Sequence, residues 1–366
     1  MPSGISSLCN FPIKRKIIAP IITVPPANLL FATNFNGVNL DSPSHWQGNF
    51  ACRRGLSGTD IDTNYAPPIG SPLRAVSSAW GYGISYTTEN LAGQLFTAQT
   101  LGAVEAMFPT EILTETVYGV SRKVLRLRKL AGGNDYKRQV WYLIQRNLSV
   151  AADLPELTIR YTINVGNLTN KLPASNRRHV LFDAKTGHPT LGGDFRVSLQ
   201  MIRANAADVT NNGATLNAVG WQLQGDNNAN GYHPDGTPIV RNPDRPIVTY
   251  WCVRNFSTVV PESQYFDLEI YRKKAATYSD LTDGQFRLRI KRFGDPDFIT
   301  LLDVTAATLP AMYDNDGALG VNRHLGQYDR AIERIFMAGL YGGYNLNVEQ
   351  EIKVTNVELW DGDMAA

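Results

Sequence analysis

Two strands at opposite ends of the chain most constrain its fold. Residues 351–361 read Glu-Ile-Lys-Val-Thr-Asn-Val-Glu-Leu-Trp-Asp, and a glycine ends them. Residues 28–37 read Asn-Leu-Leu-Phe-Ala-Thr-Asn-Phe-Asn-Gly and predict a matching opening strand. A first strand that pairs with a last strand implies one closed sandwich rather than a series of small domains.

The closing strand changes phase along its length. Ile352 and Val354 share one phase of the alternation, whereas Val357 belongs to the other. In a strand, successive side chains point to opposite faces, so such a slip needs an extra residue or two buried faces. We therefore predict a β-bulge near Thr355 or Asn356, or a strand that is buried on both faces.

Composition excludes several classes of protein. The chain has 366 residues, of which 43% are hydrophobic and 19% charged, so we expect a globular protein. Its formal charge is only +2, which argues against nucleic acid and membrane surfaces as partners. No apolar run is long enough for a transmembrane helix. Three distant cysteines, Cys9, Cys52 and Cys252, predict neither a disulfide framework nor a zinc site, and we expect mostly buried, reduced thiols.

Residues 1–27 are predicted to form an extended, proline-rich arm. A basic group at residues 14–16 precedes an apolar stretch at residues 17–24, which Pro20 interrupts. That stretch is too short and too rich in proline for a signal peptide. We expect the arm to dock on a partner, because free termini are usually disordered unless something holds them.

Strand-like alternation dominates the rest of the chain. Apolar and polar residues alternate in the segments 124–128, 157–165, 195–201, 220–224, 265–272 and 286–290, and the more apolar segments 140–145 and 247–254 are also predicted as strands. The clearest is 157–165, where one face is apolar and the other polar, as in a half-buried strand. Residues 76–90 are predicted as strand and turn, and 91–108 fit neither helical nor strand spacing.

Other segments read as loops. Residues 38–75 and 294–331 are predicted to be mostly loop, with a short helix around 331–333, and 225–245 is a long loop rich in Asp, Asn, Gly and Pro. The sequence therefore predicts an all-β, two-sheet antiparallel jelly-roll sandwich over residues 28–366, with an elaboration at about 41–135.

Four segments resemble the concanavalin A-like lectin and glucanase superfamily, in the version found in jelly-roll polysaccharide lyases. They are Leu-Thr-Ile-Arg-Tyr-Thr at 157–162, the pair at 265–271 and 283–287, Phe-Met-Ala-Gly-Leu-Tyr-Gly-Gly at 336–343, and the closing strand at 354–361. The match covers residues 28–37 and about 140–362. The resemblance implies two bent sheets, a concave face that holds carbohydrate, and structural calcium as a common feature.

The catalytic motifs of these relatives are incomplete here. The glucanase pattern Glu-x-Asp-x-x-Glu is absent, and Asp267 and Glu269, which share a strand face, read as a solvated outer face. In the lyase pattern, Tyr341 is kept, but Met337 stands where lysine is expected. Gln200 is followed by Met and Ile instead of Ile and His. The five histidines are scattered and read as surface or structural residues.

Carbohydrate binding remains the better-supported chemistry. Sugars are bound by aromatic rings and planar polar groups, and the strands and loop from 220 to 254 offer both. The candidates are Gln222, Gln224, Tyr232, His233, Tyr250, Trp251 and Arg254. Alternation places Trp221 and Trp251 in the core, which would leave the two glutamines, Tyr250 and Arg254 facing outward. Arg287 and Arg289 could pair with an acidic glycan if their face is concave.

A calcium loop is a weaker candidate. Asp226, Asn228 and Asn230 provide oxygen ligands at alternate positions, and a glycine follows. The twelfth position is Thr237 instead of glutamate, so ordinary turns stabilised by Asn and Asp are the alternative. Structural Ca²⁺ is the one cofactor expected.

The sequence predicts a non-enzymatic structural or glycan-binding protein, a component of a virus or phage particle. It would be made in the host cytoplasm, reside in the virion, bind a glycan, and contact other subunits through residues 1–27. We expect no nucleic acid partner and no membrane insertion. The alternatives are an extracellular lyase or glycoside hydrolase that acts on an acidic polysaccharide, and a cellular assembly or adhesion subunit.

Overall fold

The protein is built almost entirely of β-strands arranged in two sheets. The computed structural model describes residues 28–36, 38–45, 51–58, 80–87, 109–131, 138–145, 156–168, 172, 178–186, 194–228, 247–273, 284–305, 332–341 and 348–365. Within these residues, every strand pairing is antiparallel. The predicted all-β jelly-roll sandwich is therefore confirmed.

Sheet A has eight strands. Its order is β15 (Ile299–Thr305), β14 (Gln285–Arg292), β13 (Tyr265–Lys273), β8 (Glu156–Asn164), β17 (Gln350–Asp361), β6 (Val120–Lys129) and β5 (Thr110–Val117), and β1 (Asn28–Thr33) also pairs with β17.

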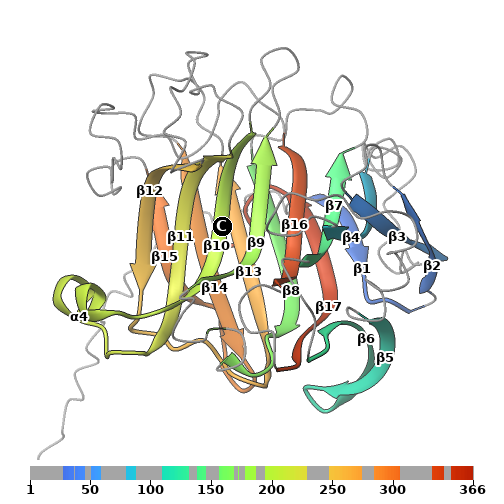
Figure 1. The fold of residues 1–366 in the computed structure, drawn as a ribbon, viewed down its shortest axis with the longest axis horizontal. Coiled ribbons are helices and arrows are strands. Elements are labelled where there is room, and N and C mark those ends of the chain that lie inside the picture. Colours follow the sequence, from blue (N-terminus) through green and yellow to red (C-terminus); the bar gives the residue numbers. More distant parts are fainter. Residues whose placement is uncertain are drawn as a thin grey trace, which may run out of the picture.

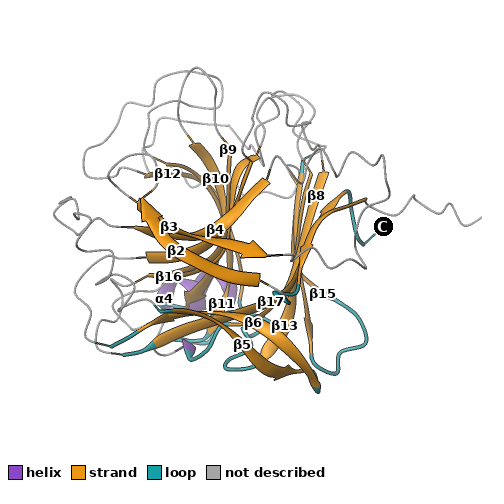
Figure 2. Cartoon of the chain, turned by 90° about the vertical axis from the view of Figure 1, so that its right-hand side faces the viewer, coloured by secondary structure: helices purple, strands orange, loops and turns teal. Residues whose placement is uncertain are grey.

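Sheet B has nine strands and forms the other layer (Figures 1 and 2). Its order is β12 (Ile247–Asn255), β11 (Val219–Asn228), β10 (Asp194–Arg203), β9 (Arg178–Thr186), β16 (Ile332–Tyr341), β7 (Arg138–Gln145), β4 (Trp80–Thr87), β3 (Ala51–Gly58) and β2 (Val38–His45). A short helix, α4 (Ala206–Asn212), connects β10 to β11.

The opening and closing strands pair as predicted. Asn28 of β1 lies opposite Asp361 of β17, and the pairing runs to Thr33 opposite Val357. The predicted bulge is also confirmed, because the register of β17 against β8 shifts between Thr355 and Glu358. Asn356, within the bulge, has a φ of 48°. Asparagine is one of the few residues that adopt this left-handed conformation readily.

The core lies between the inner faces of the two sheets. Trp221 of sheet B packs edge-on against Phe266 of sheet A, with ring centroids 6.0 Å apart, and Phe182 contacts Phe286 at 6.5 Å. Trp221 is fully buried, as the alternation predicted, and its indole Nε1 donates to the carbonyl oxygen of Thr258 at 2.9 Å. Buried Trp residues usually satisfy their N–H in this way.

Several predictions about individual segments were wrong. Residues 38–75 were expected to be loop, but β2 and β3 lie within them. Pro43 misled the prediction: β2 is the outer strand of sheet B, where a residue without an N–H is tolerated. In the same way β15 lies within the predicted loop 294–331, and residues 332–333 begin β16 rather than a helix.

The strand β8 also differs from its prediction. Its polar face was expected to be solvated, yet Thr158, Thr162 and Asn164 are buried together with the apolar face. β8 is an inner strand of sheet A, between β13 and β17, so long side chains of both neighbours cover its outer face. Burial of this face depends on which distant segments pair with β8, and the alternation within β8 cannot predict those partners.

Some predictions concern segments beyond the described residues. The arm at 1–27, the ambiguous segment 91–108 and most of the loop 225–245 lie there. The division into an arm and one elaborated sandwich therefore stays a prediction. No helix in the described part of the chain is long and apolar enough to cross a membrane.

The close approach at Gly220 yields a test of this packing. A Cβ atom at position 220 would lie 2.5 Å from Cδ1 of Phe256 and closer still to the carbonyl oxygen of Asn255. We expect Gly220→Ala to lower the free energy of unfolding by about 3 kcal/mol, because well-packed interiors tolerate added atoms poorly. Urea denaturation measures this change.

Gly119→Ala is the matched control. Gly119 has a φ of 77°, but a Cβ there meets nothing within 4 Å. Only backbone strain of about 1 kcal/mol should result. Equal destabilisation by the two substitutions would contradict the close contact at Gly220.

Candidate functional site

A row of polar side chains crosses sheet B on the face turned away from the core. Gln200 of β10 lies opposite Gln222 of β11, which in turn lies opposite Arg254 of β12. Their neighbours Leu199 and Leu223 are fully buried on the core side. Because side chains alternate along a strand, the register sets these polar groups on one face. We call Ser198, Gln200, Gln222, Gln224 and Arg254 the polar row.

Hydrogen bonds hold the polar row in one conformation. The Nε2 of Gln222 donates to the Oε1 of Gln200 and to the Oε1 of Gln224, both at 3.0 Å. The Oε1 of Gln222 accepts from the Nε of Arg254 at 2.8 Å. The amide of Gln222 thus uses both sides, which fixes its orientation and that of its neighbours.

The helix α4 anchors one end of the row. Asn205 and Asp208 form a capping box, in which each side chain accepts from the backbone N–H of the other residue at 2.9 Å. The buried Asp208 carboxylate also pairs with the guanidinium of Arg254. Burial lowers the pKa of Arg254, but Cys252 and Asp208 beside it more than offset this, so the net pKa is raised. The guanidinium therefore stays charged.

The other end of the row has an unpaired hydroxyl. Ser198 is fully buried, and its hydroxyl has no partner among the residues that the structure describes. The Oε1 of Gln200, on the same face, accepts from Gln222. Buried polar groups without partners are costly, so such groups often mark the place where a ligand or water binds.

The structure brings together three of the residues predicted to bind carbohydrate. Gln222, Gln224 and Arg254 contact one another or share a partner within the row. The expectation that the two glutamines face outward to solvent was wrong, because both are buried. Tyr250 and Trp251 belong to the neighbouring strand β12. Tyr232 and His233 lie outside the described residues. Their role in binding stays a prediction.

Sequence reasoning missed Ser198, Gln200 and Asp208 as members of this site. The alternation of β10, with Val197, Leu199 and Met201 on the core side, was visible in the sequence and places Ser198 and Gln200 on the polar face. Asp208 could not be found in this way, because its contact with Arg254 joins a helix to a strand 46 residues away.

The metal prediction has no further support. Asp226 and Asn228 lie in β11, opposite Thr249 and Ile247, and Asn230 is outside the described residues. In the described ranges, no group of three or more His, Cys, Asp or Glu side chains could hold a metal ion. The calcium site stays a prediction.

The segment that resembles the lyase strand is β16. It lies between β9 and β7, in the middle of sheet B, and β9 separates it from β10. Met337 is paired with Phe182 of β9, and Tyr341 ends the strand. His179 of β9, by contrast, lies opposite the core residue Met201 and is buried.

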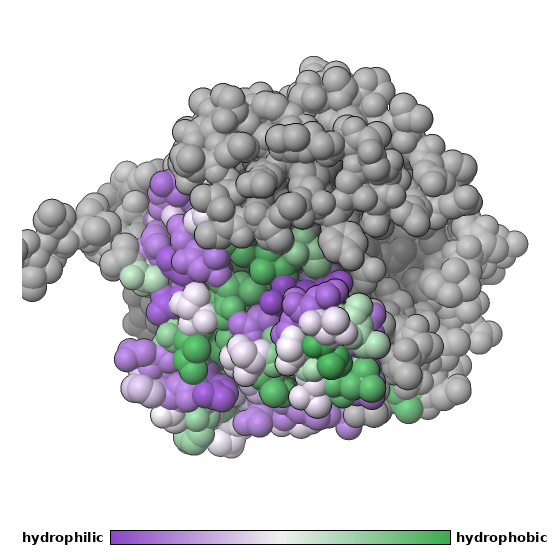
Figure 3. All heavy atoms as spheres, turned by 90° about the vertical axis from the view of Figure 1, so that its left-hand side faces the viewer, coloured by the Kyte–Doolittle hydropathy of each residue, from purple (hydrophilic) through white to green (hydrophobic). Residues whose placement is uncertain are grey.

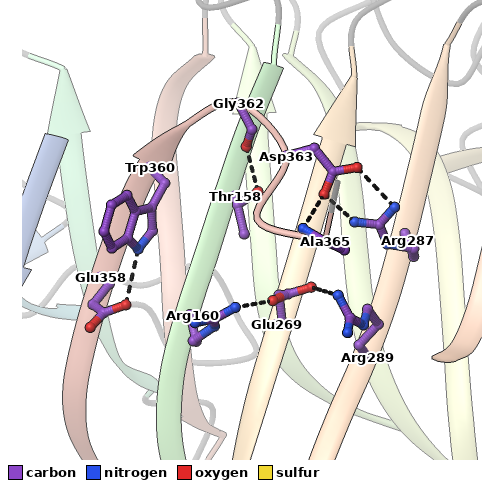
Figure 4. Close-up of polar contacts among 10 residues, drawn as sticks. All are labelled: Thr158, Arg160, Glu269, Arg287, Arg289, Glu358, Trp360, Gly362, Asp363 and Ala365. Atoms are coloured by element: carbon purple, nitrogen blue, oxygen red, sulfur yellow. Dashed lines mark hydrogen bonds and ion pairs between the residues drawn. The ribbon is translucent and has the colours of Figure 1, made fainter. Parts of the chain in front are cut away.

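The outer face of sheet A carries a second polar cluster (Figure 4). Glu269, expected to be solvated, is buried and bridges Arg160 and Arg289, with N–O distances of 2.5 and 3.0 Å. Both guanidinium groups also lie over the ring of Phe298, 4.8 and 5.1 Å from its centroid. Glu269 is buried rather than solvated because it lies directly opposite both arginines in the strand register, so their side chains cover it.

Arg287 is engaged in a similar way. It pairs with both carboxylate oxygens of Asp363 and stacks on Tyr271 at 4.8 Å. Arg287 and Arg289 were expected to pair with an acidic glycan only if their face is concave. They lie instead on the outer face of sheet A, where carboxylates of this chain already occupy them.

Comparison with known proteins gives similarity in structure only. No protein-family model and no curated protein matches the chain. A marine alginate lyase from Aplysia kurodai has 12% identity and a TM-score of 0.40, over 69% of this chain and 87% of that one. An alginate lyase from a Chlorella virus has 8% identity and a TM-score of 0.36, over 73% and 98%.

A carbohydrate-binding module is also similar. It is the CBM2 module of the evolved Dit protein of Lactobacillus casei BL23 phage J-1, with 10% identity and a TM-score of 0.32, over 92% of this chain and 98% of that one. Because these TM-scores lie below 0.5, the similarities carry no inference about activity or ligand.

The pair of Arg287 with Asp363 predicts a dependence of stability on pH. Burial raises the pKa of Asp363, but hydrogen bonds from Arg287 and from the backbone N–H of Ala365 outweigh it, so the net pKa is lowered. A lowered folded-state pKa stabilises the fold above about pH 4, and this is lost as the pH falls through the folded-state pKa. We expect Asp363→Asn to lower the free energy of unfolding by up to about 1 kcal/mol at pH 7.

The difference between Asp363→Asn and the wild type should stay constant from pH 7 to pH 5 and shrink toward pH 3. Urea denaturation at these pH values measures it. Asp297→Asn, at an exposed carboxylate outside any ion pair in the described residues, should track the wild type throughout. A difference for Asp363→Asn that grows at low pH would contradict the assignment.

Proposed function

We propose that this protein is a non-enzymatic structural and glycan-binding component of a virus or phage particle, and that it binds the glycan at the polar row of sheet B. The observation that carries the proposal is the fixed row of Gln200, Gln222, Gln224 and Arg254, which ends beside the unpaired hydroxyl of Ser198.

The chemistry of the row suits a saccharide. Amides and guanidinium groups are planar and offer donors and acceptors side by side, so they match the hydroxyl pairs of a sugar ring. The row is held rigid by its own hydrogen bonds, which lowers the entropy lost on binding. Tyr250 on β12 is the aromatic residue proposed to contact the apolar face of the ring, whereas the alternation of β12 assigns Trp251 to the core side.

The particle role rests on the predicted arm. Residues 1–27 combine an apolar stretch with several prolines, a composition suited to extended docking on another subunit. In this proposal the arm attaches the sandwich to the particle, and sheet B faces the glycan.

The polysaccharide lyase is the second candidate function. One observation favours it: β16, which ends in Tyr341, lies in the middle of sheet B, separated from β10 by β9. Proton abstraction next to a uronate needs a base together with groups that neutralise the carboxylate. The only cation in the row, Arg254, is already paired with Asp208. This arrangement suits binding better than lyase chemistry.

A polysaccharide panel tests the proposal. The full chain is passed over immobilised alginate, polygalacturonate, hyaluronate, dextran and mannan, and retention is compared with that of Gln222→Leu. We expect at least one polymer to be retained, and its affinity to fall about tenfold or more in the variant, because Gln200, Gln224 and Arg254 lose their shared partner.

Gln285→Leu is the matched control, because Gln285 lies on β14 in sheet A and its side chain donates to the exposed Asp303. It should bind like the wild type. The same polymers in solution are monitored by absorbance for unsaturated uronate products. Product formation would establish the lyase alternative, and unchanged retention of Gln222→Leu would remove the polar row from the site.

A further inference from the structure

A polar cavity lies on the opposite side of the sandwich, on the outer face of sheet A. Its volume is about 320 Å³, near the lower end for small-molecule sites. Residues from five strands or their ends line it, among them Thr33, Asn34, Arg122, Thr162, Asp267 and Asn356. The polar row belongs to sheet B, so the two sites are separate.

Two departures from regular strand geometry shape this cavity. The bulge of β17 places Asn356 in the left-handed region, with a φ of 48°. At the end of β1, Phe35 has a φ of 59°, directly after Thr33 and Asn34. Bulges re-aim side chains, and strained backbone of this kind often accompanies binding sites.

A directional chain of hydrogen bonds crosses the cavity wall. Arg122 donates to the Oδ1 of Asn356 at 3.1 Å, and the Nδ2 of Asn356 donates to the hydroxyl of Thr162 at 3.4 Å. That hydroxyl donates to the Oδ1 of Asp267 at 2.7 Å, and Tyr118 donates to the same oxygen at 3.3 Å. The chain thus joins a cation to an anion through two neutral groups.

Unused hydrogen-bonding capacity remains along this wall. Within the described residues, both hydrogen bonds to the Asp267 side chain go to Oδ1, so Oδ2 is left to accept from a ligand. The guanidinium groups of Arg122 and Arg160 line the cavity beside this oxygen, although their Nε atoms are themselves buried. A ligand hydroxyl could donate to Oδ2 and accept from a guanidinium N–H, and an apolar ligand could do neither.

Charge identifies the class of ligand further. The lining holds two arginines, Arg122 and Arg160, and two carboxylates, Asp267 and Glu358, so their formal charges cancel. Burial raises the pKa of Asp267, although hydrogen bonds from Thr162 and Tyr118 oppose this. A balanced, half-buried set of this kind favours a neutral polar molecule over a strongly charged one.

We infer that this cavity binds one unit of a neutral saccharide, through Asp267, Asn356 and the arginines Arg122 and Arg160. The inference does not depend on the polar row, because it concerns a different sheet. The protein would then hold sugars on two opposite faces.

Saturation-transfer difference NMR on the full chain tests the inference with the methyl glycosides of glucose, mannose and galactose. We expect the wild type to transfer saturation to at least one of them, with a dissociation constant on the order of 1 mM. In Asn356→Gly and Asp267→Asn the affinity should fall about tenfold or more, since each loses a hydrogen bond to the sugar.

These variants are chosen to keep the fold. Glycine accepts the left-handed conformation of residue 356, and the amide oxygen introduced by Asp267→Asn would still accept from the hydroxyl of Thr162. Asn217→Gly is the matched control, because Asn217 has a φ of 66° but lies outside the cavity lining. It should bind like the wild type, and thermal unfolding confirms that each variant is folded.

Three outcomes overturn the inference. The first is the absence of saturation transfer to every glycoside from the wild type. The second is unchanged transfer in both Asn356→Gly and Asp267→Asn. The third is loss of transfer in Gln222→Leu with retention in the two cavity variants, which would place the sugar at the polar row. That third result would support the function proposed above while removing the cavity, so the two proposals fail separately.

Discussion

The fold depends on how β17 shares its two edges with its neighbours. One edge pairs with β8 along most of its length. The other edge pairs with β6 over residues 350–354 and with β1 over residues 357–361. The bulge lies between these two stretches, where one partner strand gives way to the next. An uninterrupted pleat could not serve both partners and keep the apolar residues of each half inside, because the side-chain period of a strand is two residues.

The same bulge of β17 also positions Asn356 in the wall of the proposed binding cavity. Thr355, before Asn356, is buried, and its hydroxyl donates to the carbonyl oxygen of Lys123 at 2.7 Å, which fastens the bulge to β6. Asn356 is thereby turned toward Thr162 and Arg122. Elsewhere on sheet A, carboxylates and guanidinium groups compensate one another, as Glu269 does with Arg160 and Arg289 (Figure 4). Charged side chains on the outer face of this sheet are thus largely paired with one another. At the cavity, by contrast, hydrogen-bonding groups are left for a ligand.

Short-range periodicity made much of the fold predictable. The alternation of 265–272 and 286–290 identified β13 and β14, and the phase slip of 351–361 identified the bulge. Grouping Gln222, Gln224 and Arg254 was also within reach, because it needed only one face of two neighbouring strands. Prediction failed where pairing or packing between distant segments decides the outcome. β2 contains a proline that only an outer strand accepts, and burial of Glu269 requires arginines from β8 and β14. The helix α4 is short, and its capping box stabilises it within a segment rich in Asn.

The end of the sandwich formed by β12, β15 and α4 mixes polar and apolar side chains rather than showing one continuous apolar patch (Figure 3).

The strand topology also determines where the chain enters the sandwich. Asn28 and Asp361 lie directly opposite each other in the β1–β17 pair. Whatever precedes the first strand therefore enters at this corner, whereas the residues after β17 cross sheet A to β14, where Asp363 pairs with Arg287. A tether before β1 and one after residue 365 would thus hold the body at two separated places, which restricts its rotation more than a single pivot would.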